Sequence, residues 1–267
     1  MAPEYVLGAE PAELERLRHQ HGVWRPLSEA AFDRVGVRAG WRVLDAGCGP
    51  GLVLADLRER VGPHGEIWGV DLVPAMLAEA RRMALQRGYD NVRLLQGDLH
   101  TVSLPPDSFD LIWLRWVLSF PPDPQVILQR LAAALAPGGA LVVQDYNHEG
   151  VSLFPESAGF AAAIRATRAL YSSAGGDPWI GARLPRLFHG AGLRLEDYRG
   201  DVLTGGPGEP AFEWAQRFFP PYSAQFVARG LMSPAEREQF LAEWAERAAD
   251  PHARYFSPIV VTATGRR

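Results

Sequence analysis

The feature that most constrains this chain is a regular alternation of short apolar runs with helical segments over residues 41–145. The apolar runs fall at residues 41–46, 66–71, 91–98, 108–114 and 140–145, and helical periodicity occurs at 51–61, at 74–88 and in the segment that ends near 136–139. This alternation is typical of βαβ units, in which helices cover both faces of a parallel sheet. The sequence therefore predicts an α/β protein.

Two segments interrupt this alternation. Residues 146–180 and 203–255 are rich in aromatic residues, and the second is also rich in proline. Further helix-like or strand-like patterns fall at residues 183–192, 193–203, 234–249 and 255–265. We expect a single domain over residues 1–267, with 146–180 and 203–255 as inserted, mainly helical cap segments.

The N-terminal region has helical periodicity of its own. Leu14, Leu17 and His21 share one face of a helix over residues 10–35, and Pro26 is expected to separate it into two parts. We expect residues 1–35 to form a helical lid.

The composition excludes several classes of protein. The formal net charge is −4, and all 27 basic residues are arginine, which is typical of a GC-rich bacterial genome. Without a basic run beyond the C-terminal arginine pair, nucleic acid is a poor candidate partner. The single cysteine precludes an intrachain disulfide, and the sequence shows neither a signal segment nor an apolar stretch that could span a membrane. We expect a cytoplasmic protein, monomeric or homodimeric, with no membrane partner.

A glycine-rich loop, VLDAGCGPG, follows the first apolar run at residues 43–51. Gly47 and Gly49 can adopt positive φ and let a ligand approach the backbone, while Gly51 opens the next helix. The spacing G-x-G-x-G differs from the dinucleotide fingerprint G-x-G-x-x-G, and Asp45 before it would repel a pyrophosphate. The loop favours a nucleoside-like ligand that carries an amine or a sulfonium.

Two further acids end the next two apolar runs. Asp71 lies where a carboxylate can accept both ribose hydroxyls, and Asp98 follows Gly97 where it can accept from an exocyclic amine. As a simpler alternative, these acids cap strand ends or form turns.

In combination, these motifs resemble class I S-adenosylmethionine-dependent methyltransferases of the small-molecule branch. The motifs are DAGCGPG, VDLVPAMLAEAR, QGD, FDLIWLRWVLSF and LAPGGALVVQDY, within residues 40–145, with 255–264 as the closing strand. The resemblance implies a three-layer, doubly wound, seven-stranded sheet whose last strand is antiparallel. It also implies S-adenosyl-L-methionine as cofactor and S-adenosyl-L-homocysteine as product.

The resemblance carries a set of cofactor-binding residues onto this chain. They are Gln20, Asp45, Gly47, Cys48, Gly49, Gly51, Asp71, Leu72, Met76, Gly97, Asp98, Leu99 and Arg115. Gln20 matches a glutamine that reaches the methionine carboxylate. Cys48 is expected to be a small packed residue, because no histidine lies nearby in sequence to activate a nucleophile. Met76 is either part of the core or a contact for the adenine.

The acceptor is expected beneath the cap segments, where an apolar pocket with few polar groups suits a small aromatic or apolar molecule. The candidate acceptor-binding residues are Trp24, Trp116, Tyr146, Trp179, Phe218 and Phe219. His148 and Tyr146 are the candidate catalytic residues, although the simpler interpretation of His148 is a surface-loop histidine. A base is needed only for a hydroxyl or an acidic carbon, and no metal-ligand spacing is present.

Three alternatives remain open at this stage. The enzyme could be a carbon methyltransferase that acts on a quinone-like ring. It could be a nicotinamide-dependent dehydrogenase, against which the loop spacing and Asp45 argue. It could also be a regulatory domain that binds S-adenosylmethionine without turnover.

Overall fold

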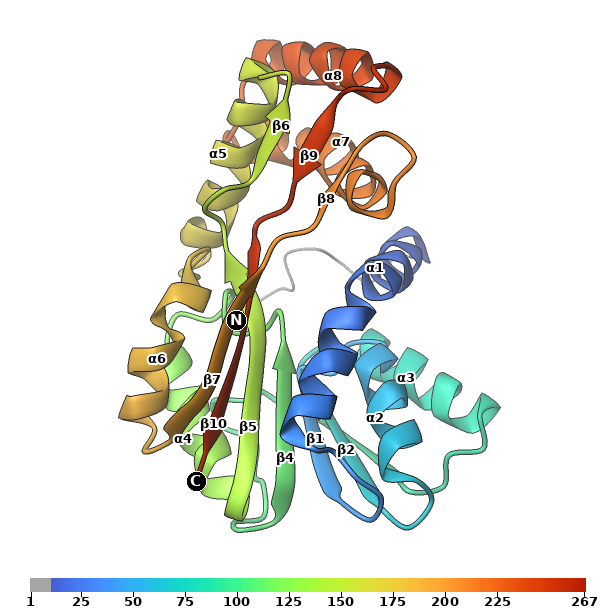
Figure 1. Ribbon diagram of the computed structural model, residues 1–267, viewed down its shortest axis with the longest axis vertical. Helices are drawn as coiled ribbons and strands as arrows, with labels where there is room; N and C mark the ends of the chain where they lie inside the picture. Colours follow the sequence, from blue (N-terminus) through green and yellow to red (C-terminus); the bar gives the residue numbers. More distant parts are fainter. Residues whose placement is uncertain (1–10) are drawn as a thin grey trace.

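The computed structural model describes residues 11–267, which form a seven-stranded sheet, flanking helices and a smaller cap (Figure 1). The sheet strands are β1 (Arg42–Ala46), β2 (Glu66–Asp71), β3 (Val92–Gln96), β4 (Phe109–Arg115), β5 (Leu135–Asn147), β7 (Arg194–Asp201) and β10 (Ile259–Arg266). Their order is β3-β2-β1-β4-β5-β10-β7, and β10 runs antiparallel to both of its neighbours. The predicted seven-stranded α/β sheet with an antiparallel last strand is confirmed.

Helices cover both faces of this sheet. They are α1 (Pro11–Val35), α2 (Leu52–Val61), α3 (Pro74–Gln86), α4 (Pro124–Ala134) and α6 (Ile180–Gly190). Successive residues of β4 point to opposite layers, as the pleat of a strand requires. Leu111 and Trp113 pack with α1, α2 and α3 on one face, whereas Ile112 and Leu114 pack with α4 and α6 on the other. These three layers are those expected from the sequence.

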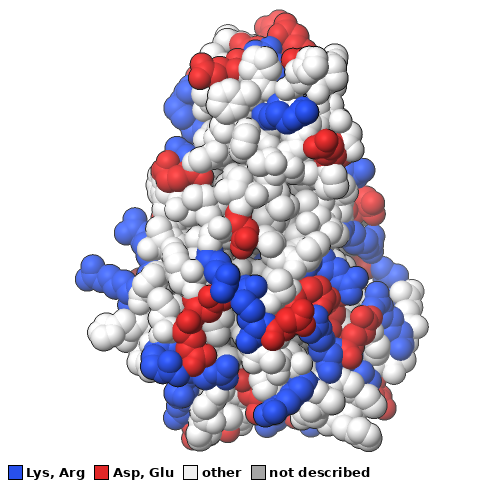
Figure 2. Space-filling view, viewed as in Figure 1, with Lys and Arg blue, Asp and Glu red and all other residues white. Residues whose placement is uncertain are grey.

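The cap has its own apolar core above the carboxyl ends of the parallel strands (Figure 1). Its elements are α5 (Ala158–Ser173), α7 (Pro210–Ala228), α8 (Pro234–Ala249) and a small sheet of β6 (Ser152–Phe154), β9 (Arg254–Phe256) and β8 (Thr204–Gly205). Phe160, Phe212, Phe240 and Tyr255 fill this core. Figure 2 shows basic and acidic side chains intermixed over the lower half of the molecule, while the middle of the cap carries few charges.

The N-terminal helix differs from the expectation. Pro26 was predicted to separate two parts, but α1 continues through it as one helix of 25 residues. Proline removes one helical hydrogen bond, a cost that tertiary packing can offset. Trp24 is buried in the cap core and Phe32 in the sheet core, so packing holds the helix on both sides of Pro26.

The second cap segment also holds more structure than its composition suggested. Helix α7 continues through Pro220 and Pro221 and was not predicted, because its proline content hid a buried aromatic face. The closing strand expected at 255–265 is divided at Ser257, so that β9 belongs to the cap and β10 to the main sheet.

Candidate active site

A cavity of about 710 Å³ lies at the carboxyl ends of the parallel strands, between the sheet edge, α1 and the cap helices α5 and α7. The chain order reverses between β1 and β4, which are neighbours in the sheet. Ligands of open α/β sheets bind at such a switch point. The glycine-rich loop that follows β1 therefore forms part of the cavity wall.

Within this loop, Gly47 and Gly49 have φ values of +80° and +52°, which residues with a side chain rarely adopt. A Cβ atom on Gly47 would lie 2.4 Å from the side chain of Val117, so that glycine also lets the loop after β4 approach. Nothing lies within 4 Å of the corresponding Cβ position at Gly49. The backbone there is open to close approach by a ligand.

Asp45 ends β1 inside the cavity and is only 2% exposed. Burial raises the pKa of its carboxyl group to about 7, although Arg115 nearby opposes that shift. Its Oδ2 atom has no hydrogen-bond partner among residues 11–267. A buried acceptor left unpaired is costly, and a cationic amine would both pair it and favour its ionised form. This observation fits the amino group of S-adenosylmethionine.

Asp71 ends β2 and joins two parts of the cofactor site. Its Oδ2 accepts a hydrogen bond from the backbone N of Gly49 at 2.8 Å, and its Oδ1 accepts from the backbone N of Val73 at 2.9 Å. Each carboxylate oxygen can accept a second hydrogen bond, so ribose hydroxyls can still bind. Burial raises the pKa of Asp71. The residue thus fixes the loop whether or not it also holds a ribose.

Asp98 lines the cavity beyond the end of β3. Its Oδ1 accepts from the backbone N of His100 at 2.9 Å and lies 2.8 Å from Nδ1 of that histidine, and these contacts lower the pKa of the Asp98 carboxyl group. The remaining oxygen is available to an amine such as that of adenine.

Helix α1 contributes a buried polar cluster from above. The side-chain oxygen of Gln20 accepts from Arg16 at 2.5 Å and from the indole of Trp214 at 3.2 Å. Arg16 in turn donates two hydrogen bonds of 2.7 Å to Glu13, which also accepts from Tyr222 at 2.9 Å. Since its oxygen is taken, the amide NH₂ of Gln20 is the end that can donate to a carboxylate. The cluster joins α1 to the cap helix α7.

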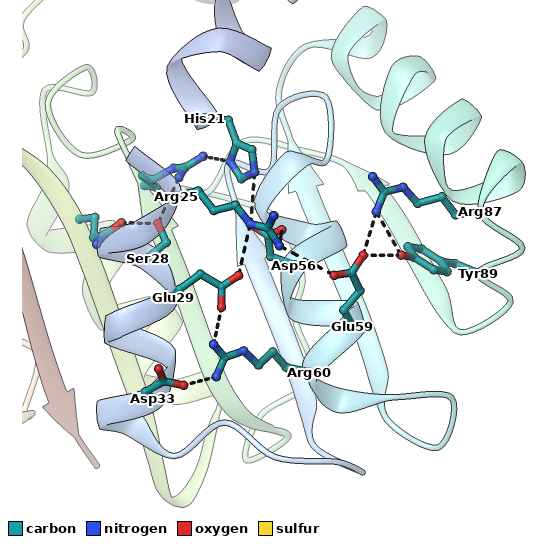
Figure 3. Close-up of polar contacts among 12 residues, drawn as sticks. His21, Arg25, Ser28, Glu29, Asp33, Asp56, Glu59, Arg60, Arg87 and Tyr89 are labelled. Atoms are coloured by element: carbon teal, nitrogen blue, oxygen red, sulfur yellow. Dashed lines mark hydrogen bonds and ion pairs between the residues drawn. The ribbon is translucent and has the colours of Figure 1, made fainter. Parts of the chain in front are cut away.

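Arg115 links the same helix to the sheet. Its guanidinium lies 2.9 Å from Nδ1 of His21 and donates to Oγ of Ser28 at 3.1 Å. His21 lies 3.2 Å from Asp56 of α2, as Figure 3 shows. Burial lowers the pKa of Arg115 to about 10, so it stays charged at neutral pH. Arg115 therefore anchors α1 beside the cofactor loop.

Ion pairs continue this contact toward the surface (Figure 3). Arg25 lies 3.1 Å from Asp56, while Glu29 and Asp33 of α1 both pair with Arg60 of α2. Asp56 is buried, whereas the pairs of Arg60 with Glu29 and Asp33 are partly exposed, and pairs exposed to solvent contribute little individually. Together with Arg115, these contacts hold α1 against α2 and the sheet.

The far side of the cavity is an aromatic wall formed by Trp116, Phe120, Tyr146, His148 and Tyr171. Trp116 stacks on Tyr146 at 5.7 Å, and His148 lies 5.3 Å from Tyr146 and 5.3 Å from Tyr171. Phe120 stacks on Tyr171 at 5.1 Å. Apolar walls with few polar atoms suit flat organic ligands.

His148 is the polar group of interest in this wall. It is 6% exposed, and its Nε2 has no hydrogen-bond partner in the part of the chain that the structure describes. Burial, assisted by the charge of Arg168, lowers its pKa to about 3, so the imidazole is neutral at pH 7. Burial raises the pKa of Tyr146 well above its usual value. Tyr146 therefore stays protonated, and of the two candidate catalytic residues only His148 can accept a proton.

A buried carboxylate that sequence reasoning missed supports this wall. Oδ2 of Asp145 accepts from the backbone N atoms of Val117, Leu118 and Ser119 at 3.1, 2.8 and 3.2 Å. Burial raises the pKa of Asp145 to about 6. These bonds fix the loop after β4, in which Trp116 has a φ of +55°. Asp145 lies near the end of a predicted strand, as Asp45 and Asp71 do, and this position could have identified it as a site residue.

The structure brings most of the predicted site residues together. Those that line the cavity are Gln20, Asp45, Gly47, Cys48, Gly49, Asp71, Leu72, Met76, Gly97, Asp98, Leu99, Arg115, Trp116, Tyr146, His148, Phe218 and Phe219. Their roles toward a ligand remain predictions. Lining residues that were not predicted as site residues include Arg16, Leu17, Phe120, Thr167, Tyr171 and Trp214. Arg16 could have been found, since it lies one helical turn before Gln20.

Three predicted site residues do not line the cavity. Trp24 is 1% exposed and packs edge-on against Trp116 and Trp214, behind the wall. Trp179 lies outside, where its indole donates to Glu149 at 2.7 Å. Gly51 packs against α3, because a Cβ there would meet Ala80 and Met83. The placement of these three residues at the cavity was wrong.

Together, the doubly wound sheet, the glycine-rich loop at its switch point and an acid at or just beyond the end of each of the first three strands define a class I S-adenosylmethionine-dependent methyltransferase. Residues 38–186 match the family model described as a methyltransferase domain, and the chain belongs to this family. S-adenosylmethionine is accordingly its cofactor, as the fit of Asp45 indicates.

Curated relatives match over part of their length. Aklanonic acid methyltransferase DauC of Streptomyces sp. (strain C5) is 36% identical over 130 residues, which cover 43% of this chain and 59% of the relative. Demethylmenaquinone methyltransferase of Lactococcus lactis subsp. lactis (strain IL1403) is 30% identical over 138 residues, covering 52% of this chain and 54% of the relative. The chain thus spans about half the length of the curated relatives it matches.

A solved structure shares the fold. The crystal structure of a SAM-dependent methyltransferase from Aquifex aeolicus aligns with a TM-score of 0.51 at 21% identity, covering 64% of this chain and 81% of the other. Over residues 11–267, none of the helices combines the length and the apolar character that crossing a membrane requires. The same residues contain no group of three or more His, Cys, Asp or Glu side chains placed to hold a metal ion.

Proposed function

We propose that this protein transfers the methyl group of S-adenosylmethionine to a small, flat organic acceptor bound against the aromatic wall. The observation that carries the proposal is that one cavity joins the glycine-rich loop to that wall. A donor and an acceptor bound in the same enclosed space can react in line while water is excluded. In this proposal residues 1–267 act as one domain, with residues 1–35 as its lid.

The polar groups on the sheet side have separate roles in cofactor binding. Asp45 would hold the amine, Asp71 the ribose hydroxyls and Asp98 the adenine amine, while Gln20 would donate to the carboxylate. The bound cofactor supplies a methyl group that its sulfonium already activates. The protein therefore has to orient the acceptor and take up its proton rather than activate the donor.

We place the transferred methyl group on a hydroxyl oxygen of the acceptor. A carboxylate acceptor would require a nearby cation. Of the arginines in or near the cavity, Arg16 is engaged by Glu13, Arg115 contacts His21 and Ser28 beside the cofactor loop, and Arg168 lies behind the wall. As the oxygen–methyl bond forms and the sulfur–methyl bond breaks, the electron pair of the broken bond stays on sulfur. The hydroxyl proton passes to Nε2 of His148. An oxygen that is gaining a methyl group becomes strongly acidic, so even a weakly basic imidazole can accept this proton.

A ring carbon of a quinol is the second candidate acceptor. It is favoured by the similarity to the demethylmenaquinone methyltransferase, whose acceptor is named in its title. The aromatic wall would suit either ring. The position of the new methyl group decides between them.

The test combines cofactor binding with an acceptor screen. Calorimetry should show S-adenosylhomocysteine binding with a dissociation constant of order 1 μM, about −8 kcal/mol, and no comparable binding of NAD. The purified protein is then incubated with methyl-labelled S-adenosylmethionine and a panel of hydroxylated, carboxylated, amino and quinol-type rings, including alizarin. Label on a hydroxyl oxygen supports the proposal, and label on a ring carbon, a carboxylate or a nitrogen contradicts the assigned acceptor atom. Cofactor binding without transfer to any ring would favour a regulatory domain.

A further inference from the structure

His148 lies in the turn that follows β5, and four residues from neighbouring elements hold it in place. Its backbone N donates to the carbonyl of Pro178 at 3.1 Å, and its carbonyl accepts a hydrogen bond from Arg168. Its ring lies between those of Tyr146 and Tyr171. These partners come from β5, α5 and the loop before α6, so tertiary structure sets the position of the imidazole.

Arg168 is at the centre of a cluster behind the wall, which we call the outer cluster: Arg168, Glu149 and Trp179. The guanidinium of Arg168 lies 5.5 Å from the centre of the Trp179 ring and 3.9 Å from the Glu149 carboxylate. Glu149 also accepts from the indole of Trp179 at 2.7 Å. None of the three lines the cavity. The contact between the cluster and the cavity wall that the structure shows is the hydrogen bond from Arg168 to the carbonyl of His148.

We propose that Arg168 is a positioning residue for methyl transfer, which holds the turn so that Nε2 of His148 meets the acceptor hydroxyl. This inference rests on the proposed function. A histidine that served only packing would be expected to pair its buried ring nitrogen, because an unpaired one is costly. Here the nitrogen is unpaired while both backbone groups are held. Supporting contacts of this kind are what keep a functional side chain within reach of its target.

The charge of Arg168 has a second effect on His148. The titratable groups that face the imidazole are Tyr146 on β5 and Tyr171 and Arg168 on α5, with Glu149 on the turn. Burial raises the pKa of both tyrosines, so both are neutral at pH 7. Arg168 is the charge that lowers the pKa of His148 further than burial alone. Removing that charge should make the imidazole easier to protonate.

Arg168→Gln tests the proposal in the full-length protein, with Arg165→Gln as a matched control. Arg165 lies on the same helix one turn earlier, is exposed, and pairs with Glu236 at 2.9 Å. With the ring that is methylated fastest in the screen, Arg168→Gln should lower kcat roughly 10- to 100-fold, the loss expected from a misplaced catalytic group. Its affinity for S-adenosylhomocysteine and its Tm should match those of the Arg165→Gln control.

A second readout does not need turnover. In ¹⁵N-histidine NMR spectra, the His148 signals are identified by their loss in His148→Gln and followed with pH in the presence of S-adenosylhomocysteine. In Arg168→Gln they should titrate at higher pH than in the wild type, and Arg168→Lys should restore that titration while kcat stays reduced. Lysine restores the positive charge but not the planar guanidinium contacts. The titration of His148 therefore reports the effect of the charge, and kcat reports the effect of positioning.

Two outcomes overturn the inference. Unchanged kcat and unchanged His148 signals would show that Arg168 is a surface residue without influence on the site. Parallel losses of kcat, cofactor affinity and Tm in both Arg168 variants would show that it only supports the fold. If the wild type methylates nothing, the proposed function fails, whereas the NMR comparison still reports whether Arg168 controls His148.

Discussion

The two halves of the cavity are built in opposite ways. The cofactor half is polar, and its carboxylates and glycines follow β1, β2 and β3 within residues 45–98. The acceptor half is aromatic, and its residues come from the loop after β4, the end of β5, α5 and α7. Apart from Gln20 of α1 and Arg115 at the end of β4, the first half is therefore encoded locally, while the second exists only once distant segments have packed together.

This difference has an energetic side. In the cofactor half, Oδ2 of Asp45 has no hydrogen-bond partner among residues 11–267, and burial raises the pKa of its carboxyl group to about 7. A bound cation would stabilise the ionised form of this carboxylate. In the acceptor half, two ring nitrogens of the aromatic wall have no hydrogen-bond partner among residues 11–267, Nε2 of His148 and the indole Nε1 of Trp116. We expect that replacing a single polar residue of the cofactor half will strongly weaken cofactor binding. In the acceptor half, most single substitutions other than at His148 should change activity little.

The largest expected effect belongs to Asp71→Ala. The variant removes a charged acceptor for two ribose hydroxyls and also releases Gly49 and Val73. We expect a loss of about 2–4 kcal/mol in binding of S-adenosylhomocysteine, on the order of 100-fold in the dissociation constant. Calorimetry measures this change, with Asp33→Ala on the surface of α1 as the control. An unchanged constant would mean that Asp71 is only a strand cap, and that neither a ribose contact nor its hold on the loop contributes to cofactor binding.

His148→Gln should be nearly as damaging, in a different parameter. Glutamine can accept a hydrogen bond but cannot take up a proton, so kcat should fall roughly 100-fold. The affinity for S-adenosylhomocysteine should not change, since His148 lies in the acceptor half. Steady-state kinetics with the methylated ring, together with calorimetry, separate the two parameters. Weaker cofactor binding in this variant would contradict the division into two halves.

The cofactor half could be predicted from the sequence better than the acceptor half. The positions of β1 to β5 along the chain followed from the alternation of apolar runs with helical segments. Asp45, Asp71 and Asp98 followed from their places at strand ends, because parallel strands bring their carboxyl ends to one edge. Gln20 and Arg115 came from the family resemblance. Asp45 and Asp71 needed no knowledge of distant segments. The antiparallel β10 came from the family resemblance rather than from periodicity.

The acceptor half was harder to predict, because aromatic content does not say which face of a cap a ring occupies. Trp24 and Trp179 were assigned to the cavity by type, but one is buried behind the wall and the other pairs with Glu149 outside it. Helix α7 was hidden by Pro220 and Pro221. Tertiary packing settled these cases, and local propensity does not include it.

A smaller effect concerns pH and the cofactor half alone. The folded pKa of Asp45, about 7, is raised above its ordinary value, so the cofactor-free protein holds a proton there below pH 7. Binding of a cationic amine requires its release, so affinity should fall as pH falls through 7. We expect a roughly eightfold weaker affinity for S-adenosylhomocysteine at pH 6.0 than at pH 7.5, from the ionised fraction alone. In Asp45→Asn the affinity should be weak and independent of pH over this range, and a pH-independent wild type would refute the assignment.

The smallest expected effect tests where the acceptor half ends. Trp179→Phe keeps a ring beside Arg168 but removes the indole N–H that Glu149 accepts. Because the change reaches the acceptor only through the turn that carries His148, we expect kcat to fall about two- to fivefold, less than for a misplaced catalytic group. The KM of the acceptor and the affinity for S-adenosylhomocysteine should stay near the wild-type values, as kinetics and calorimetry can measure. If instead KM rises about tenfold while kcat is unchanged, Trp179 contacts the acceptor directly, and the acceptor half extends beyond the wall described above.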